Sequence, residues 1–284
     1  MLGQTLTKVL IENRYEVFGV SKTSRLSLPG LYEINADLCD SNLVEKILKH
    51  SKPDIIIHTA AFTNLEYCER NISECYTMHV ELTQKLAEYA SAKMIYISTD
   101  SVFKGDLGGY AEDDPTYPLN YYAHSKLEGE WSMLRTNHLS TVIRTNIYGF
   151  KRPPGNSLVE WALSSLREKQ DVKGFTDVIF NPLYVGQLSQ IIIKLLSSKI
   201  SGLLHVGASE NISKFTFLRK LASTFGYPED FVSASLSSDN NEIRRPKNTA
   251  LNIQRMKKLF NEVPLLSTGF DMLKTDYLNF YGID

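Results

Sequence analysis

The spacing of apolar residues changes repeatedly along the chain between a strand-like and a helix-like period. Leu6, Val9 and Leu10 share one face of a helix, and Asn42 followed by Glu45 resembles a capping box at the start of another. Short apolar runs predict strands over residues 15–20, 31–34, 54–58, 94–97, 141–144 and 203–206. Helical stripes predict further helices over residues 43–48, 72–90, 122–134, 157–167, 185–196, 215–225 and 270–280. This alternation favours an α/β fold with a doubly wound parallel sheet.

The regular alternation loosens after about Gly149. Residues 151–155 form a loop with two prolines and a glycine, and residues 174–182 read as irregular. The helix expected over residues 185–196 is strongly apolar, which suits packing on the face of a sheet better than a place in a separate lobe. We therefore expect a Rossmann-like dinucleotide-binding domain with a smaller C-terminal substrate-binding lobe. The domain is expected to cover residues 1–150 and about 183–206, and the lobe residues 151–182 and 207–284.

Composition and charge argue against several classes of function. A formal net charge of −1 on 284 residues gives no electrostatic reason to expect nucleic acid or an anionic membrane as a partner. No stretch reaches the ~20 apolar residues of a membrane span, and the first residues form no secretory signal. The three cysteines are an odd number without metal-ligand spacing, which is typical of reduced cytosolic thiols. We expect a cytoplasmic protein without a metal site.

Tyr122 and Lys126 carry the chemistry that the sequence makes most visible. Residues four apart lie on one face of a helix, so a phenol and an ammonium can sit side by side. A phenol ordinarily titrates near pH ~10, and a nearby positive charge lowers its pKa. Such a tyrosine exchanges a proton with a carbonyl or an alcohol, and Thr99 adds a hydroxyl that can hold the same oxygen. These three residues are the predicted catalytic set of a nicotinamide-dependent carbonyl reductase.

A second pair with the same spacing, Tyr89 and Lys93, is expected by chance in a chain with 15 tyrosines. Tyr89 ends a helix that leads into a strand, which places it at the amino edge of the sheet. Ligands of open α/β sheets bind beyond the carboxyl ends of the strands. Tyr122 opens a helix after a loop that contains Pro115 and Pro118, on the ligand side. We therefore assign the chemistry to Tyr122.

The start of the chain has one feature of a dinucleotide site. Leu2 and Gly3 precede a helix as the last part of a Gly-rich turn would, because a glycine lets the backbone approach a pyrophosphate. At the end of the second strand, where NAD binders place an acid, residues 21–25 have hydroxyls and cations instead. Ser21 and Lys22 are suited to hold a ribose 2′-phosphate, which favours NADPH, with NADH as the alternative.

A strand and further glycines normally come before this first helix. We expect the complete protein to carry about ten to fifteen residues before Met1. That strand is central in the fold, so its loss should leave a slot between two unpaired strand edges. Upstream coding DNA without an in-frame strand and glycine pair would refute this expectation.

Four segments, spread over nearly the whole chain, carry a family resemblance. They are Ala60–Thr63, Ser98–Gly105, Pro118–Glu130 and Arg245–Leu251. Only the third is specific by itself, and together they resemble the dTDP-4-dehydrorhamnose reductases of the extended short-chain dehydrogenase/reductase superfamily. The resemblance implies NADPH-dependent reduction of a nucleotide-linked 4-keto sugar in deoxysugar biosynthesis. The resemblance is also compatible with a homodimer of this chain.

The resemblance also implies a role for each matching position. Tyr122 would protonate the C4 oxygen of the sugar, Lys126 would lower the pKa of Tyr122 and hold the nicotinamide ribose, and Thr99 would hydrogen-bond the carbonyl. The residues expected at the cofactor are Leu2, Gly3, Ser21, Lys22, Asp37, Leu38, Ala60, Ala61, Thr63, Tyr122 and Lys126. Those expected at the substrate are Thr63, Leu65, Thr99, Asn146, Asn181 and Arg245. A guanidinium fork such as that of Arg245 suits a diphosphate.

Several positions depart from the family pattern. Ser101 stands where the family usually has tyrosine, Lys104 where it usually has aspartate, and Ala123 where glycine is frequent. His79 takes a place where asparagine is common, and residues 144–149 lack a tryptophan often used against the sugar. These differences leave the reduction chemistry unchanged and leave the particular sugar open.

Two other functions stay open at this point. An epimerase or dehydratase of nucleotide sugars would use the same residues and retain its NAD between turnovers. The chain also resembles, more distantly, the non-catalytic regulatory subunit of methionine adenosyltransferase, which shares this fold. Retained cofactor without net NADPH consumption would favour the first function. NADPH titration and a search for a co-purifying partner would identify the second.

Overall fold

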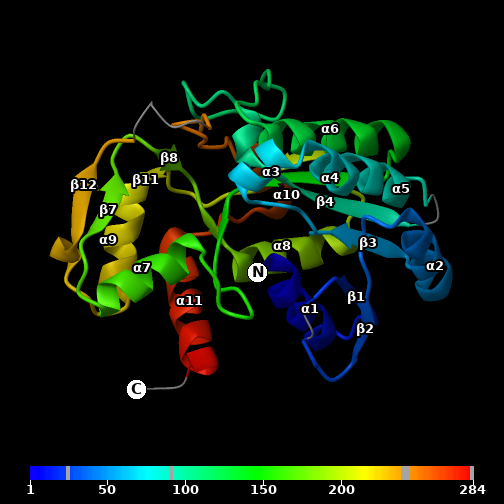
Figure 1. The fold of residues 1–284 in the computed structure, drawn as a ribbon, viewed down its shortest axis with the longest axis horizontal. Helices are drawn as coiled ribbons and strands as arrows, with labels where there is room; N and C mark the ends of the chain where they lie inside the picture. Colours follow the sequence, from blue (N-terminus) through cyan, green and yellow to red (C-terminus); the bar gives the residue numbers. More distant parts are fainter. Residues whose placement is uncertain (24–25, 90–91, 238–242, 282–284) are drawn as a thin grey trace.

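A computed structural model describes residues 1–23, 26–89, 92–237 and 243–281 of the protein. Its main body is a parallel β-sheet with helices on both faces, and a smaller lobe lies beside it (Figure 1). The sheet has two parts, β1-β2 and β10-β5-β4-β3 in spatial order. The strands are β1 Val17–Ser21, β2 Leu31–Asn35, β3 Ile55–His58, β4 Lys93–Thr99, β5 Thr141–Thr145 and β10 Gly202–His205. The α/β fold with a parallel sheet is therefore confirmed.

The sheet is interrupted between β1 and β3. β1 pairs with β2, β3 pairs with β4, and no backbone ladder joins β1 to β3 in the described part of the chain. The slot that the sequence predicts between these strands stays a prediction.

Alternate side chains of β4 explain why both faces of the sheet are covered. Met94 and Tyr96 pack in one buried apolar cluster with α2, α5 and α6, whereas Ile95 packs in another with α1 and α8. Successive side chains of a strand point to opposite faces, so a continuously apolar strand must be covered twice. Figure 1 shows α6 and α8 on opposite sides of the sheet. These helices are α1 Leu2–Glu12, α2 Ser41–Ser51, α5 Leu82–Ala87, α6 Tyr121–Thr136 and α8 Val185–Leu196.

The single helix expected over residues 72–90 is divided into α4 (Ile72–Tyr76), a π-helix η1 (Thr77–Glu81) and α5. Residue 90 lies outside the described residues. A π-turn often marks a functional site. Here it lies against α6 so closely that a Cβ on Gly129 would come within 2.2 Å of the carbonyl oxygen of His79. The glycine therefore allows α6 to pack against the π-helix.

The capping box expected from Asn42 and Glu45 is wrong. Asp40 is the N-cap of α2, and its carboxylate accepts hydrogen bonds from the backbone N–H groups of Asn42 and Leu43. Glu45 instead pairs with Lys49 at 2.6 Å. Aspartate caps a helix as well as asparagine does, so the cap two residues upstream is the one used.

The lobe contains two short strands in a stretch that the sequence predicts to be irregular. β7 pairs in parallel with β12, and β8 pairs with β11. Both partners come from distant parts of the chain, so local periodicity does not reveal them. The elements of the lobe are α7 Leu158–Arg167, β7 Val172–Phe175, β8 Ile179–Phe180, β11 Ile212–Ser213, α9 Lys214–Thr224, η3 Glu229–Phe231, β12 Val232–Ser235 and α11 Leu266–Tyr281. The helix α10 Gln254–Phe260 instead lies against β10 of the sheet. The short elements that connect the lobe and the sheet are α3 Leu65–Arg70, η2 Asp100–Val102, β6 Ile147–Tyr148 and β9 Leu183–Tyr184.

The two-part division of the chain stays a proposal. It is supported by β10, which pairs with β5, and by α8, which packs against α1, since both elements come from the stretch assigned to the sheet. In the described part of the chain, no helix combines the length and the apolar character needed to cross a bilayer.

Candidate active site

Thr99 and Tyr122 meet at the carboxyl edge of the sheet. Thr99 is the last residue of β4, and Tyr122 lies in the first turn of α6. Asn120 caps this helix, because its Oδ1 accepts a hydrogen bond of 3.0 Å from the backbone N–H of Ala123. The cap fixes the first turn so that the phenol of Tyr122 hydrogen-bonds with the hydroxyl of Thr99.

The pKa of Tyr122 is raised, whereas the sequence predicts that it is lowered. Burial of the phenol is the main cause, the hydrogen bond with Thr99 opposes it, and the charge of Asp100 adds to the rise. The net lowering of this pKa that the sequence predicts is therefore wrong for this structure, because burial outweighs the effects that favour the phenolate. Tyr122 carries its proton at neutral pH, and this is the form that can donate one.

Lys126 follows Tyr122 on the same helix face and directs its ammonium at β4. Its Nζ donates a hydrogen bond of 2.7 Å to the carbonyl oxygen of Ile97 and lies 3.9 Å from the centroid of the Tyr96 ring. Burial lowers the pKa of Lys126 to about 7, an effect that the charge of Glu130 opposes. Lys126 is thus a buried amine one helical turn from Tyr122.

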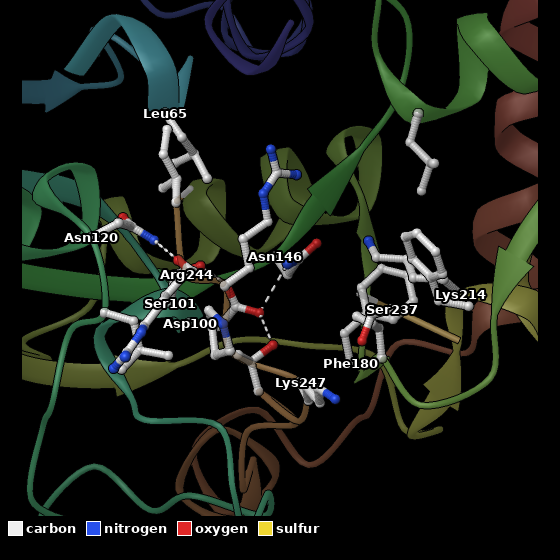
Figure 2. A pocket seen from close by; sticks show the side chains of 18 of the residues that line it. Leu65, Asp100, Ser101, Asn120, Asn146, Phe180, Lys214, Ser237, Arg244 and Lys247 are labelled. Carbon is white, nitrogen blue, oxygen red and sulfur yellow. Dashed lines mark hydrogen bonds between the residues drawn. The ribbon is translucent and has the colours of Figure 1, made fainter. Parts of the chain in front are cut away.

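Asp100 holds the hydroxyl of Thr99 in one orientation. Its carboxylate accepts hydrogen bonds from Thr99 Oγ1 at 3.2 Å, from Asn146 Nδ2 at 2.9 Å and from Thr249 Oγ1 (Figure 2). A threonine hydroxyl has one proton. That proton goes to Asp100, and the same hydroxyl oxygen accepts a hydrogen bond of 3.1 Å from the backbone N–H of Ser101. Asp100 follows Thr99 in the same sequence motif, but the motif alone does not identify Asp100 as a site residue.

His79 joins the segment after β3 to the catalytic helix. Its Nε2 accepts a hydrogen bond of 3.0 Å from the backbone N–H of Phe62, and its Nδ1 lies 2.8 Å from Ser125 Oγ. The imidazole ring meets the Tyr122 ring edge-on, with centroids 5.9 Å apart. Burial lowers the pKa of His79 to about 3, so the ring is neutral and its Nδ1 carries the proton toward Ser125.

The residues expected at the cofactor lie along one edge of the sheet. Ser21 ends β1, Asp37 follows β2, and Ala60 and Ala61 follow β3. Leu38 follows Asp37, and the carboxyl ends of parallel strands are where nucleotides bind in such sheets. Lys22 Nζ lies 2.6 Å from Asp37, so the two predicted adenosine-side residues form an ion pair. Residues 24 and 25 of the predicted segment lie outside the described residues.

Gly3, in the first turn of α1, lies against Thr59, the residue that follows β3. A Cβ at Gly3 would come within 2.9 Å of Thr59 Oγ1. Close packing of helix on strand is one task of the glycines in a dinucleotide-binding turn. Leu2 is 5% exposed and belongs to the core under the sheet. The arrangement of the strand ends and of Gly3 fits a dinucleotide.

Tyr89 and Lys93 lie at the opposite edge, as the sequence predicts. Lys93 is the first residue of β4, and its Nζ donates hydrogen bonds to the carbonyl oxygens of Leu195 at 2.6 Å and Ser198 at 2.8 Å. This lysine has a structural role far from the carboxyl edge, and its position agrees with the choice of Tyr122 over Tyr89, which stays a prediction.

A pocket of about 1170 Å³ lies between the carboxyl edge of the sheet and the lobe (Figure 2). It includes three residues expected at the substrate, namely Leu65, Asn146 and Arg245. Asp100 and Asn120 also line it and are neighbours of Thr99 and Tyr122. Thr99, Tyr122 and Lys126 are not among the described residues that line it, so the pocket begins beside the candidate catalytic residues and extends into the lobe.

Thr63 and Asn181 are not among the described residues that line the pocket. Thr63 is exposed in the loop after β3. Asn181 is 2% exposed, and its amide both donates to and accepts from the backbone of Leu251, each at 3.0 Å. The side chain of Asn181 thus holds the C-terminal segment in place.

Most of the cations in the pocket are absent from the sequence-based set. The cations that line the pocket besides Arg245 are Lys173, Lys214, Arg244 and Lys247. Two acids, Glu66 and Asp100, line it as well. Figure 2 shows Lys214 on the lobe side of the wall, apart from Arg244 and Lys247, which belong to one segment. Arg244 precedes the segment Arg245–Leu251 and Lys247 lies within it, so the sequence carries a signal for both, whereas Lys173 and Lys214 share no local motif. The excess of positive charge suits phosphate groups.

The fold and the site together define an NAD(P)-dependent oxidoreductase of nucleotide sugars. The RmlD substrate binding domain family matches residues 1–266, and the chain belongs to that family. The expected family and the Rossmann-like fold are thereby confirmed.

Known relatives agree with this assignment. The chain is 30% identical to the spore coat polysaccharide biosynthesis protein SpsK of Bacillus subtilis, over 87% of this chain and 89% of that protein. It is 27% identical to the methionine adenosyltransferase 2 subunit beta of Bos taurus, over 91% of this chain and 79% of that protein. The crystal structure of a dTDP-4-dehydrorhamnose reductase from Bacillus anthracis in complex with NADP is similar at a TM-score of 0.81 and 26% identity, covering 92% of this chain and 98% of that chain.

Proposed function

We propose that this protein uses NADPH to reduce the keto group of a nucleotide-linked 4-keto sugar, the activity by which dTDP-4-dehydrorhamnose reductases are named. The observation that carries the proposal is the protonated Tyr122, hydrogen-bonded to Thr99 beside a cation-rich pocket. The phenol carries its proton at neutral pH, and reduction of a carbonyl needs a proton donor. The similarity to a reductase crystallised with NADP supports the cofactor.

The residues around the site have separate tasks in this mechanism. Bound NADPH supplies the hydride for the carbonyl carbon. Tyr122 donates its proton to the carbonyl oxygen, and Lys126 stabilises the phenolate that remains, because a nearby cation favours the anion. Thr99, held by Asp100, keeps the phenol in place before the transfer. Residues at the ends of β1, β2 and β3 hold the dinucleotide, and the pocket cations hold the diphosphate of the substrate.

The function is tested by NADPH consumption against a panel of nucleotide 4-keto sugars. We expect net oxidation of NADPH, at 340 nm, with at least one dTDP- or UDP-linked 4-keto sugar and the matching alcohol as product. NADH should support a lower rate. Tightly retained NAD with no net consumption on any sugar of the panel would instead indicate an epimerase or dehydratase and contradict the proposal.

A non-catalytic regulatory subunit is the second candidate, favoured by the similarity to the methionine adenosyltransferase 2 subunit beta. This candidate predicts a stable complex with a methionine adenosyltransferase catalytic subunit and no turnover of any 4-keto sugar. Size-exclusion chromatography with light scattering would detect such a complex. The same measurement on the protein alone tests the homodimer, which stays a prediction.

A further inference from the structure

Lys214 faces the pocket at the first position of α9. Ser213 caps this helix, because its Oγ accepts a hydrogen bond of 3.0 Å from the backbone N–H of Thr216. The Nζ of Lys214 lies 3.5 Å from the centroid of the Phe180 ring, which is 2% exposed in the pocket wall. Figure 2 shows both side chains on the lobe side of the pocket. The cap and the aromatic contact hold the ammonium in one place.

The ammonium of Lys214 has no hydrogen-bond or ion-pair partner among the residues that the structure describes. Asp100 is the nearby acid, but its oxygens already accept hydrogen bonds from Thr99 and Asn146. Arg245 adds a charge of the same sign nearby. Burial lowers the pKa of Lys214 to about 8, since a desolvated cation without a partner is unfavourable. An oxygen-rich anion in the pocket would offset this cost.

We propose that Lys214 binds a phosphate oxygen of the substrate diphosphate, between Arg245 and the reacting end of the pocket. The proposal rests on the proposed function, because a nucleotide-linked sugar brings the diphosphate. Lys214 is an electrostatic neighbour of both Arg245 and Asp100, and Asp100 contacts Thr99, the partner of Tyr122. A phosphate held by Lys214 therefore fixes how far the sugar extends toward Tyr122.

Binding of dTDP and of inorganic pyrophosphate to the full chain, by titration calorimetry near neutral pH, tests the proposal without turnover. Lys214→Met keeps an unbranched side chain over Phe180 and removes the charge. We expect it to weaken both ligands roughly tenfold or more, the usual effect of losing a charged hydrogen bond. Lys220→Met, at an exposed position of the same helix, is the matched control and should change neither affinity by more than about twofold.

The pH dependence of binding separates Lys214 from the other cations. Wild-type affinity for dTDP should fall as the pH rises through about 8, because Lys214 loses its charge there. Lys214→Arg stays charged at every such pH and should keep its affinity. The other charged groups that face the pocket are the same in both proteins, and they are Glu66, Asp100, Lys173, Arg244, Arg245 and Lys247.

A Lys214→Met variant that binds both ligands as tightly as wild type overturns the proposal, and so does an equal pH dependence in wild type and Lys214→Arg. A protein with the expected binding pattern that reduces no 4-keto sugar would contradict the proposed function while supporting this anion site.

Discussion

At the scale of single residues, the site depends on two groups whose burial moves their pKa values in opposite directions. Burial raises the pKa of Tyr122 and lowers that of Lys126 to about 7, because both groups lose the solvation of their charged forms. Lys126 therefore lies near its titration point while Tyr122 stays protonated. The charge state of Lys126 determines how strongly the phenolate is stabilised after Tyr122 has donated its proton.

Lys126→Met should stabilise the protein at low pH and reduce turnover. The folded-state pKa of Lys126 lies below its unfolded value, so the cost of burying its charge is complete below pH about 7 and disappears as the pH rises toward the unfolded pKa. We expect the variant to exceed wild type in free energy of unfolding by about 1 kcal/mol or more at pH 6, and the difference to shrink by pH 9. Urea unfolding at both values measures this. A difference that does not change with pH would show that the burial of the charge is not responsible.

At the scale of elements, the N-terminus of α6 is tied to the segment that carries the pocket arginines. Asn120 uses both ends of its amide, since Oδ1 caps α6 at Ala123 and Nδ2 donates a hydrogen bond of 3.0 Å to the carbonyl oxygen of Arg244 (Figure 2). Asn120 is 8% exposed. The position of the arginines relative to Tyr122 therefore depends on this one side chain.

Asn120→Asp should raise KM for the substrate more than it lowers kcat. Aspartate caps α6 equally well, but its carboxylate cannot donate to the carbonyl oxygen of Arg244, and the resulting repulsion should displace the segment at a cost of about 1–2 kcal/mol. Asn64→Asp is the matched control, because Asn64 caps α3 through the same acceptor contact, to the N–H of Tyr67, at an exposed position. Steady-state kinetics of both variants checks the expectation. An unchanged KM in Asn120→Asp would contradict the coupling.

Local pattern is sufficient for the strands of the sheet and for the long helices, but not for the short strands of the lobe or for the π-helix. The unbroken apolar runs of β3 and β4 reveal buried strands, and Pro118–Glu130 places the catalytic helix. The strands β7 and β8 depend on partners far along the chain, and the π-helix around His79 depends on close packing with Gly129. Asp100 and Lys214 become visible as site residues only when the fold brings them to one pocket. The predicted direction of the Tyr122 pKa shift is wrong for the same reason, because the spacing of residues does not reveal which side chains are buried.

At the scale of the whole molecule, three buried histidines should make the fold sensitive to acid. Burial lowers the pKa of His58, His79 and His205 to about 3 each. The unfolded chain binds protons at these residues below pH about 6.5, whereas the folded protein does not. The free energy of unfolding should therefore fall as the pH falls from about 6.5 toward 3, by up to about 1.4 kcal/mol per pH unit for each histidine.

His58→Phe should reduce this sensitivity. The ring of His58 packs against Tyr96 with centroids 5.3 Å apart, and phenylalanine can keep this contact without titrating. His124→Ala is the control, since His124 is exposed, and it should follow the wild-type pH dependence. Urea unfolding between pH 5 and 7 measures the slopes. Identical slopes in His58→Phe and wild type would show that His58 does not contribute.

The central claim is that the phenol of Tyr122 supplies the proton when NADPH reduces the sugar carbonyl. Tyr122→Phe removes one oxygen and keeps the ring against His79. Its kcat for NADPH oxidation with the best 4-keto sugar of the panel should fall by about 10²- to 10⁴-fold, with the dissociation constant of the nucleotide sugar within about twofold of wild type. A Tyr122→Phe variant that turns over at the wild-type rate would contradict the account.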